Sequence, residues 1–220
     1  GTQLTDGMAY DYAEKMKLIK STHHFDNDIV MAAKNIGKRY GVSKPHMQSV
    51  AKIALAIFDG TKKLHGLGQR ERLLLECAVY LHDCGKYVSL IDTAECNYQI
   101  IMATEIIGLS AMEREIIAQI VRFNTLKMES YDSLSKTSDL GLSEYLTVNK
   151  LAAILRISNA MDRSHLQKIE QIQVSVRENK MLIHLVTNRD YTLEQGLLGE
   201  KLDFFEDVFG IRPILKVKRS

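Results

Sequence analysis

The segment from residue 70 to residue 83, RERLLLECAVYLHD, constrains the fold more than any other part of the sequence. Its apolar residues are nearly continuous from Leu73 to Leu81, so the helix that it predicts has almost no polar face. A helix that is apolar nearly all round is covered by other elements on every side. We therefore expect residues 70–83 to form a central helix that ends in a His82–Asp83 pair.

Amphipathic segments that could surround this helix lie on both sides of it in the sequence. Apolar residues recur at helical spacing over 26–41 and 43–58, and Ser43 and Pro45 mark the start of the second segment. Helices are also predicted over 94–107, over 110–124 from a capping box of Ser110 and Glu113, and over 147–165. The polar stretch 125–143 predicts a long loop. The chain is therefore predicted to be mainly α, a helical bundle.

The hydrophobic period changes from helical spacing to alternation near Lys168. Residues 172–187 alternate around the turn residues 178–180 and predict a β-hairpin. A helix over 197–209 and a third strand over 212–218 complete a small β-β-α-β (α+β) subdomain at the C-terminus. We expect three parts: a leading segment over 1–22, a helical domain over 23–168 and the small subdomain over 169–220.

The composition argues against two classes of partner. A net charge of +2 with 25% charged residues gives no reason to expect nucleic acid or a membrane. The sequence has neither an apolar run of bilayer-spanning length nor the pattern of a signal peptide at its start. Cys77, Cys84 and Cys96 form an odd set without zinc-site spacing. This cysteine usage favours a reducing, cytoplasmic compartment.

Polar residues with ligand chemistry interrupt three of the apolar helices: His46, the pair His82 and Asp83, and Asn159 with Asp162. Imidazole nitrogens and carboxylate oxygens bind divalent metals, and a bound metal activates water and polarises phosphoryl oxygens. The alternative is a structural polar cluster that fixes helix packing. In that case His82 hydrogen-bonds the helix end or Asn159, and Asp83 pairs with one of the cations Lys86, Arg156 or Arg163.

Four segments in a fixed order carry a resemblance to a known family: residues 46–59, 74–89, 106–124 and 150–165. They resemble an HD-type helical domain and, within that class, the C-terminal region of the Ppx/GppA family of exopolyphosphatases and guanosine pentaphosphate phosphatases. Residues 4–15 resemble the segment that joins the family's N-terminal phosphatase domain to this region. The resemblance covers nearly the whole chain, and it implies an HD-type bundle followed by a small α/β tail.

The resemblance also implies a set of metal ligands, and this chain departs from it. The matching positions are His46, His82, Asp83 and Asn159, where an aspartate is expected in place of Asn159. An amide oxygen carries no net charge, so the site loses part of its attraction for a cation. Cys96 and Asn124 also stand where relatives can carry histidine. We therefore expect no tightly bound metal and no catalytic residue in this chain, with Mg²⁺ or Mn²⁺ acting only in the full-length enzyme.

By the same resemblance, hydrolysis of phosphoanhydride bonds takes place in an N-terminal phosphatase domain that is not present in these 220 residues. This chain is then expected to bind polyphosphate or guanosine polyphosphate and to form a homodimer. The predicted phosphate-binding residues are Lys86, Arg122, Arg156 and Arg163. A further basic track is predicted from Lys34, Lys38, Arg39, Lys44 and Lys52.

Two alternatives stay open at this point. The chain could be a self-sufficient, metal-dependent HD phosphohydrolase that uses His46, His82 and Asp83. It could also be a non-catalytic module that binds phosphorylated nucleotides, with the stretch 125–143 as a lid.

Overall fold

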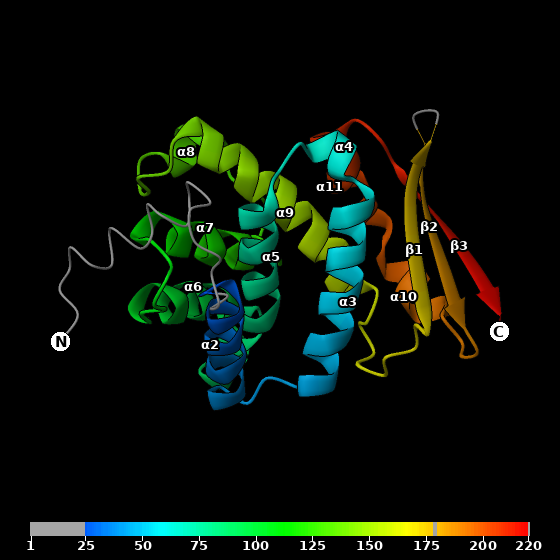
Figure 1. Cartoon of the computed structure of the whole chain (residues 1–220), viewed down its shortest axis with the longest axis horizontal. Helices are drawn as coiled ribbons and strands as arrows, with labels where there is room; N and C mark the ends of the chain where they lie inside the picture. The colour runs from blue at the N-terminus through cyan, green and yellow to red at the C-terminus, as the bar shows by residue number, and fades with distance from the viewer. Residues whose placement is uncertain (1–24, 178–179, 220) are drawn as a thin grey trace, which may run out of the picture.

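A helical body precedes a small three-stranded sheet in the computed structural model of the chain, which describes residues 25–177 and 180–219 (Figure 1). The body contains α2 (Phe25–Arg39), α3 (Lys44–Gly60), α4 (Lys62–His65), α5 (Gln69–Leu81), the 3-10 turn η1 (Cys84–Tyr87), α6 (Thr93–Ala103), α7 (Ala111–Arg122), α8 (Tyr131–Leu134) and α9 (Leu142–Ala160). No helix in the described part of the chain is long and apolar enough to cross a bilayer. The prediction of a mainly α chain is confirmed.

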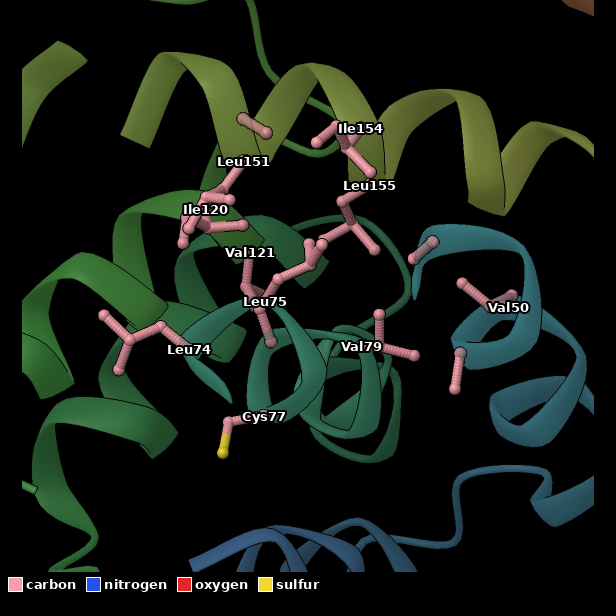
Figure 2. Close-up of a cluster of buried hydrophobic side chains, with 14 of the residues drawn as sticks. Val50, Leu74, Leu75, Cys77, Val79, Ile120, Val121, Leu151, Ile154 and Leu155 are labelled. Atoms are coloured by element: carbon pink, nitrogen blue, oxygen red, sulfur yellow. The ribbon is translucent and has the colours of Figure 1, made fainter. Parts of the chain in front are cut away.

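The helix α5 lies at the centre of the body, as its continuous apolar sequence predicts. It packs against α2, α3, α7 and α9, and every residue from Leu73 to Leu81 except Glu76 is buried. Figure 2 shows Leu75 and Val79 of α5 among side chains of α7, α9 and α3. Burial raises the pKa of the Cys77 thiol to about 12, so this cysteine fills core volume and is not a reactive thiol.

The C-terminal subdomain is the predicted β-β-α-β unit, with one additional helix. β1 (Gln171–Arg177) and β2 (Lys180–Thr187) are antiparallel, and β3 (Pro213–Arg219) runs parallel to β2, so the strand order is β1-β2-β3. The short helix α10 (Thr192–Leu197) precedes α11 (Gly199–Phe209) in the connection between β2 and β3. Lys180, predicted to lie in the turn, is instead paired with Arg177 in the ladder. Residues 178 and 179 lie outside the described residues.

The subdomain and the helical body share one hydrophobic core. Met181, Ile183 and Leu185 of β2 are buried in the same cluster as the core residues of α3, α5 and α9. The end of α3 lies very close to β1, because a Cβ atom at Gly60 would stand only 2.7 Å from the Cβ atom of Val174. The predicted division at residue 168 stays a prediction, and the predicted leading segment 1–22 lies outside the described residues.

Several helix boundaries differ from those predicted. The polar stretch 125–143 contains the short helix α8, whose N-cap Ser130 accepts a hydrogen bond from the backbone of Ser133. α9 begins at Leu142, earlier than predicted, and it ends at Ala160 rather than at residue 165. The capping box of Ser110 and Glu113 is present as predicted. The early end of α9 matters most, because it turns residues 161–168 into an irregular loop that faces the site described next.

Candidate functional site

His46, near the start of α3, is held by the carboxylate of Asp162 in the loop that follows α9. The Nδ1 atom of His46 lies 2.8 Å from Oδ2 of Asp162, and both residues are almost fully buried, with 0% and 2% of their surface exposed. An ionised carboxylate only accepts hydrogen bonds, so Nδ1 is the protonated, donating nitrogen of His46. In the neutral ring, the other nitrogen, Nε2, then carries the free lone pair.

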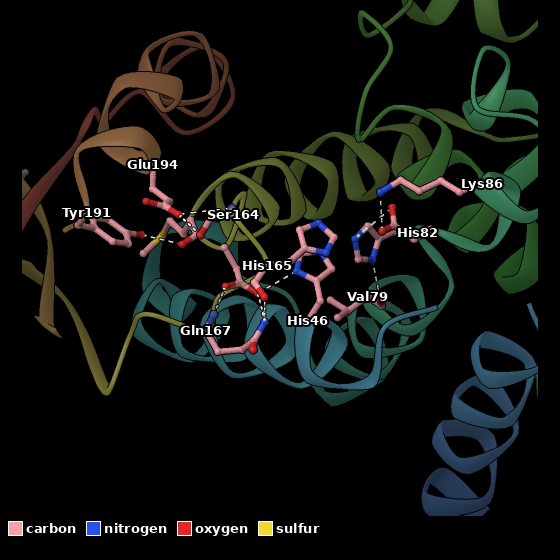
Figure 3. Close-up of polar contacts among 12 residues, drawn as sticks. His46, Val79, His82, Lys86, Ser164, His165, Gln167, Tyr191 and Glu194 are labelled. Atoms are coloured by element: carbon pink, nitrogen blue, oxygen red, sulfur yellow. Dashed lines mark hydrogen bonds and ion pairs between the residues drawn. The ribbon is translucent and has the colours of Figure 1, made fainter. Parts of the chain in front are cut away.

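His82, at the end of α5, is oriented in the same way by a backbone carbonyl. Its Nδ1 donates to the carbonyl oxygen of Val79 over 2.7 Å (Figure 3). His82 is 1% exposed, and burial lowers its pKa, although Asp83 opposes this shift. The neutral ring with a free Nε2 lone pair is therefore the favoured form at neutral pH.

Each of the two imidazoles keeps one nitrogen that no other described residue contacts by a hydrogen bond. The rings of His46 and His82 have centroids 5.4 Å apart, and both Nε2 atoms are buried without a hydrogen-bond partner among the described residues. Together with a carboxylate oxygen of Asp83, their ligand atoms all lie within 4.8 Å of one another. We call His46, His82, Asp83 and Asp162 the histidine corner.

This arrangement fits a divalent metal. In metal-binding histidines, the N–H of the second ring nitrogen typically donates a hydrogen bond to a carboxylate or a carbonyl, as in His46 and His82. Two imidazoles and one carboxylate suit a transition metal such as zinc or manganese. His46, His82 and Asp83 would hold the ion, and Asp162 would orient His46 from outside the ligand set.

Asp83 already has a cationic partner within the chain. Nζ of Lys86 lies 2.7 Å from Oδ2 of Asp83, and Nε2 of His82 lies 3.7 Å from Oδ1. Burial opposes ionisation of Asp83, but His82 and Lys86 outweigh it and hold the pKa of this carboxyl below its usual value. Of the cations predicted to pair with Asp83, Lys86 is the one that does so within the described residues.

Asn97 on α6 fixes the backbone that carries the His82–Asp83 pair. Its side chain donates to the carbonyl of His82 over 2.7 Å and accepts from the amide of Gly85 over 2.6 Å. Gly85 is required here, because a Cβ atom would stand 2.3 Å from the carbonyl oxygen of Thr93. Asn97 is 2% exposed. Nothing in its sequence context singles it out.

The loop 161–168 closes the histidine corner on the side of the small subdomain. The Asp162 carboxylate also accepts from the backbone amide of Gln167 over 2.8 Å. The ring of His165 stacks on that of His46, with centroids 3.7 Å apart and planes 6° apart. His165 and Gln167 both have positive φ angles, of 56° and 47°, which are unfavourable for residues with a Cβ atom.

Glu194 of α10 anchors this loop from outside. Its buried carboxylate accepts from the Ser164 hydroxyl over 2.5 Å (Figure 3). It also pairs with Nζ of Lys168 over 2.9 Å. Burial opposes ionisation of Glu194, but these two partners lower the pKa of its carboxyl below the usual value. The sequence did not identify Glu194 or His165 as site residues, because their partners come from distant or irregular segments.

A second polar region lies where the end of α9 meets α11 and residues 124–127. A cavity of about 260 Å³ and a neighbouring one of about 280 Å³ share Asn124, Thr125, Arg156 and Lys201 in their linings. The first also contains Asn159 and Arg163, and the second adds Lys127 and Glu200. We call the two together the basic cavity. Glu200 is the sole acidic residue among the described residues that line it, and it lies 3.2 Å from Lys201.

Arg156 is fixed in place within this cavity. Its Nε donates to the carbonyl of Phe123 over 2.6 Å, Nη2 donates to the carbonyl of Leu126, and the guanidinium lies 4.1 Å above the ring of Phe204. Burial lowers the pKa of this guanidinium from its usual value, but an arginine remains charged at neutral pH. Nη1 keeps its N–H groups for a ligand, since both contacts with carbonyls use other nitrogens.

The predicted site residues therefore lie in different places. Asn159 lines the basic cavity, and the carboxylate that contacts His46 is Asp162, three residues later. Of the predicted phosphate-binding residues, Arg156 and Arg163 share the basic cavity, whereas Lys86 lines another cavity, of about 310 Å³, with Asp83 and His165. Arg122 forms ion pairs instead: its Nε lies 3.3 Å from Oε2 of Glu95, and its Nη1 lies 3.6 Å from Oε1 of Glu129.

The chain was compared with known protein families. The family model described as Ppx/GppA phosphatase, domain III, matches residues 30–204. A comparison with curated proteins found no match to the chain. The matched range includes both the histidine corner and the basic cavity.

Proposed function

The chain belongs to the Ppx/GppA phosphatase family, and from this premise we propose that it binds the polyphosphate chain or the guanosine polyphosphate on which a phosphatase domain acts. The observation that supports this proposal is the basic cavity, in which Arg156, Arg163 and Lys201 line one hollow. A condensed phosphate carries negative charge on every unit, so a cluster of fixed cations is the feature that would retain it.

The cations of the basic cavity would contribute to phosphate binding in different ways. Arg156 is held by two carbonyls and an aromatic ring, so it loses little entropy when it binds a phosphate. Arg163 is exposed, and its guanidinium takes part in none of the ion pairs found among residues 25–177 and 180–219, so no ion pair has to break when it binds a phosphate. A planar guanidinium can bind two oxygens of one phosphate, and Lys201 adds a mobile point charge.

We propose further that these 220 residues do not hydrolyse phosphoanhydride bonds by themselves. In this proposal an N-terminal phosphatase domain performs the reaction in the cytoplasm, with Mg²⁺ or Mn²⁺, and this chain extends the binding surface and forms a homodimer. The division into a leading segment over 1–22, a helical HD-like domain over 23–168 and a subdomain over 169–220 belongs to the same proposal. The reason to expect no hydrolysis by these residues is that their sequence lacks a glycine-rich phosphate loop.

Calorimetric titration of the purified chain with long-chain polyphosphate at two salt concentrations tests the proposal. We expect saturable binding that weakens as salt rises, because contacts between charged groups are screened. A phosphate-release assay on the same samples with Mg²⁺ should give no turnover. Absence of binding at low salt would refute the binding role, and sustained phosphate release would refute the non-catalytic role.

One observation favours a second candidate, a metal-dependent phosphohydrolase centred on the histidine corner. The free Nε2 atoms of His46 and His82, with Asp83 beside them, form a donor set for a divalent ion. A bound ion would supply an activated water and a Lewis acid for a phosphoryl oxygen. The residues themselves would hold the donor nitrogens unprotonated and exclude water from the buried side.

Metal analysis of gently purified protein separates the two candidates. The second requires about one transition metal per chain and phosphate release that is lost in His82→Ala. Metal-free protein that still binds polyphosphate would rule out the second candidate and support the first.

A further inference from the structure

An exposed apolar segment joins η1 to α6, outside both sites described above. It contains Tyr87, Val88, Leu90 and Ile91, and we call these four residues the apolar tip. Their exposed fractions are 71%, 62%, 81% and 100%. Single exposed apolar residues are common on protein surfaces, but four within residues 87–91 point to a partner that covers them.

Hydrogen bonds of the backbone fix the apolar tip in this exposed position. The amides of Val88 and Ser89 both donate to the carbonyl of Gly85 over 2.9 Å. The Ser89 hydroxyl accepts from the amide of Asp92 over 3.0 Å, and the Thr93 hydroxyl donates to the carbonyl of Ser89 over 2.8 Å. The exposure of the side chains is therefore a fixed feature of the fold.

Unpaired cations lie beside the apolar tip. The ring of Tyr87 packs edge-on against that of Tyr40, with centroids 5.9 Å apart, which brings the tip to the connection between α2 and α3. This connection lies at the lower edge of the body in Figure 1. Lys38, Arg39 and Lys44 border the connection, and all three are exposed. They take part in none of the ion pairs found among residues 25–177 and 180–219.

Little negative charge opposes these cations. Residues 38–44 contain no acidic residue, and the first turn of α3 contains none either. Lys86 precedes the tip and pairs with Asp83 over 2.7 Å, so these two charges offset each other. Asp92, directly after the tip, is the other carboxylate of residues 83–92. The local excess of positive charge is not visible in the composition of the whole chain, where acidic residues elsewhere balance it.

We propose that the apolar tip inserts into the interface of a lipid bilayer that contains anionic headgroups. Apolar side chains on a projecting segment leave water when they enter the headgroup region, and the cations beside them stay at the anionic surface. Tyr87 suits this boundary, because its ring is apolar and its hydroxyl can remain in water. Such a contact is peripheral and requires no membrane-spanning helix.

The charge pattern favours a bilayer over a second copy of the chain. A two-fold contact through the tip would bring two sets of the same cations together, and their repulsion would oppose it. An anionic bilayer offers both the apolar medium and the negative charge that these residues lack. The inference does not rest on the proposed function, because no residue of the tip and none of these cations lines the basic cavity.

The predicted basic track divides between two places. Three of its members lie beside the apolar tip: Lys38, Arg39 and Lys44. The other two have contacts within the helical body. Lys34 lies 4.7 Å from the centroid of the Tyr80 ring, and Lys52 donates to the carbonyl of Glu170 over 2.6 Å.

Sedimentation of the chain with lipid vesicles tests this inference. We expect binding to vesicles of equimolar phosphatidylcholine and phosphatidylglycerol, and much weaker binding to vesicles of phosphatidylcholine alone. Leu90→Ser/Ile91→Ser should weaken binding to the anionic vesicles by about tenfold or more, because two apolar side chains no longer leave water. The matched control is Leu142→Ser/Leu146→Ser, which changes two exposed leucines of α9 and should bind as the wild type does.

A second pair of variants isolates the charge. Lys38→Ala/Lys44→Ala should weaken binding to the anionic vesicles by about tenfold and leave the weak binding to phosphatidylcholine unchanged. Lys62→Ala/Lys63→Ala removes the same charge from exposed lysines on α4, and it should have little effect. Equal losses in the two lysine pairs would overturn the inference.

A fluorescent reporter separates insertion from attraction to the surface. The chain contains no tryptophan, so Ile91→Trp places a single indole at the tip. We expect its emission to move to shorter wavelength with anionic vesicles, since the indole enters an apolar medium. Absence of vesicle binding, or binding with unchanged emission, would overturn the inference. A dimer that Leu90→Ser/Ile91→Ser abolishes, in a chain that binds no vesicles, would assign the tip to a second copy instead.

Discussion

The histidine corner and the basic cavity lie at the same end of α9 but are built in opposite ways. Asp162 hydrogen-bonds the buried His46, while Asn159 and Arg163 line the basic cavity. In the corner, each imidazole is fixed by a short hydrogen bond, and the free atoms are acceptors. In the cavity, Arg156, Arg163 and Lys201 present the N–H donors of cations. One region is therefore suited to a cation and the other to an anion.

The contrast predicts that stability depends on the corner far more than on the cavity. Asp162→Ala leaves Nδ1 of buried His46 and the amide of Gln167 without their acceptor. We expect a loss of about 3 kcal/mol in the free energy of unfolding, measured by urea denaturation. Arg163→Ala, at the next residue, is the control, and we expect it to change stability by less than about 0.5 kcal/mol, as for an exposed side chain. Equal effects in the two variants would remove the contrast.

Cation binding should be confined to the corner. Titration with Zn²⁺ at pH 7.5 should show His82→Ala binding at least about tenfold more weakly than the wild type, because one of the two free Nε2 donors is lost. His184→Ala is the matched control, since His184 is exposed on β2. Zinc binding that is the same in all three proteins would show that the corner is a structural cluster only.

Glu194, which anchors the loop 161–168, should make a contribution to stability that depends on pH. The folded-state pKa of Glu194 lies below the ordinary value of 4.5, so its contribution to stability is present above that pH and is lost as pH falls through the folded pKa. We expect Glu194→Gln to cost about 1 kcal/mol at pH 7 and progressively less below pH 4.5. Urea denaturation of both proteins across this range measures the difference. A cost that stays constant with pH would contradict the assignment of the charged pair with Lys168.

The parts of the structure that follow from local sequence were predictable. The continuous apolar run of α5 required a central position, the alternation over 172–187 gave the hairpin, and Ser110 with Glu113 marked the start of α7. These features depend on residues a few positions apart. The same is true of His82 and Asp83 as neighbours at the end of a buried helix.

The rest depends on contacts between distant residues. His46 and its partner Asp162 are 116 residues apart, and Asn97 reaches His82 across 15 residues. A helical pattern continued through residue 165 gave no reason to expect that α9 ends at Ala160. Because α9 ends there, residues 161–168 form a loop, and Asp162 and His165 of this loop both contact His46. The placement of Asn159 in a cavity with Arg156 and Arg163 likewise required the packing of α11.

The most direct test of the account is polyphosphate binding by Arg163→Ala/Lys201→Ala, measured by calorimetry beside the wild type and Lys62→Ala/Lys63→Ala. If the basic cavity holds the polyanion, the first pair loses about tenfold or more in affinity and its binding depends less steeply on salt. The control pair removes the same charge and should bind as the wild type does. Equal affinity in all three proteins would contradict the central claim.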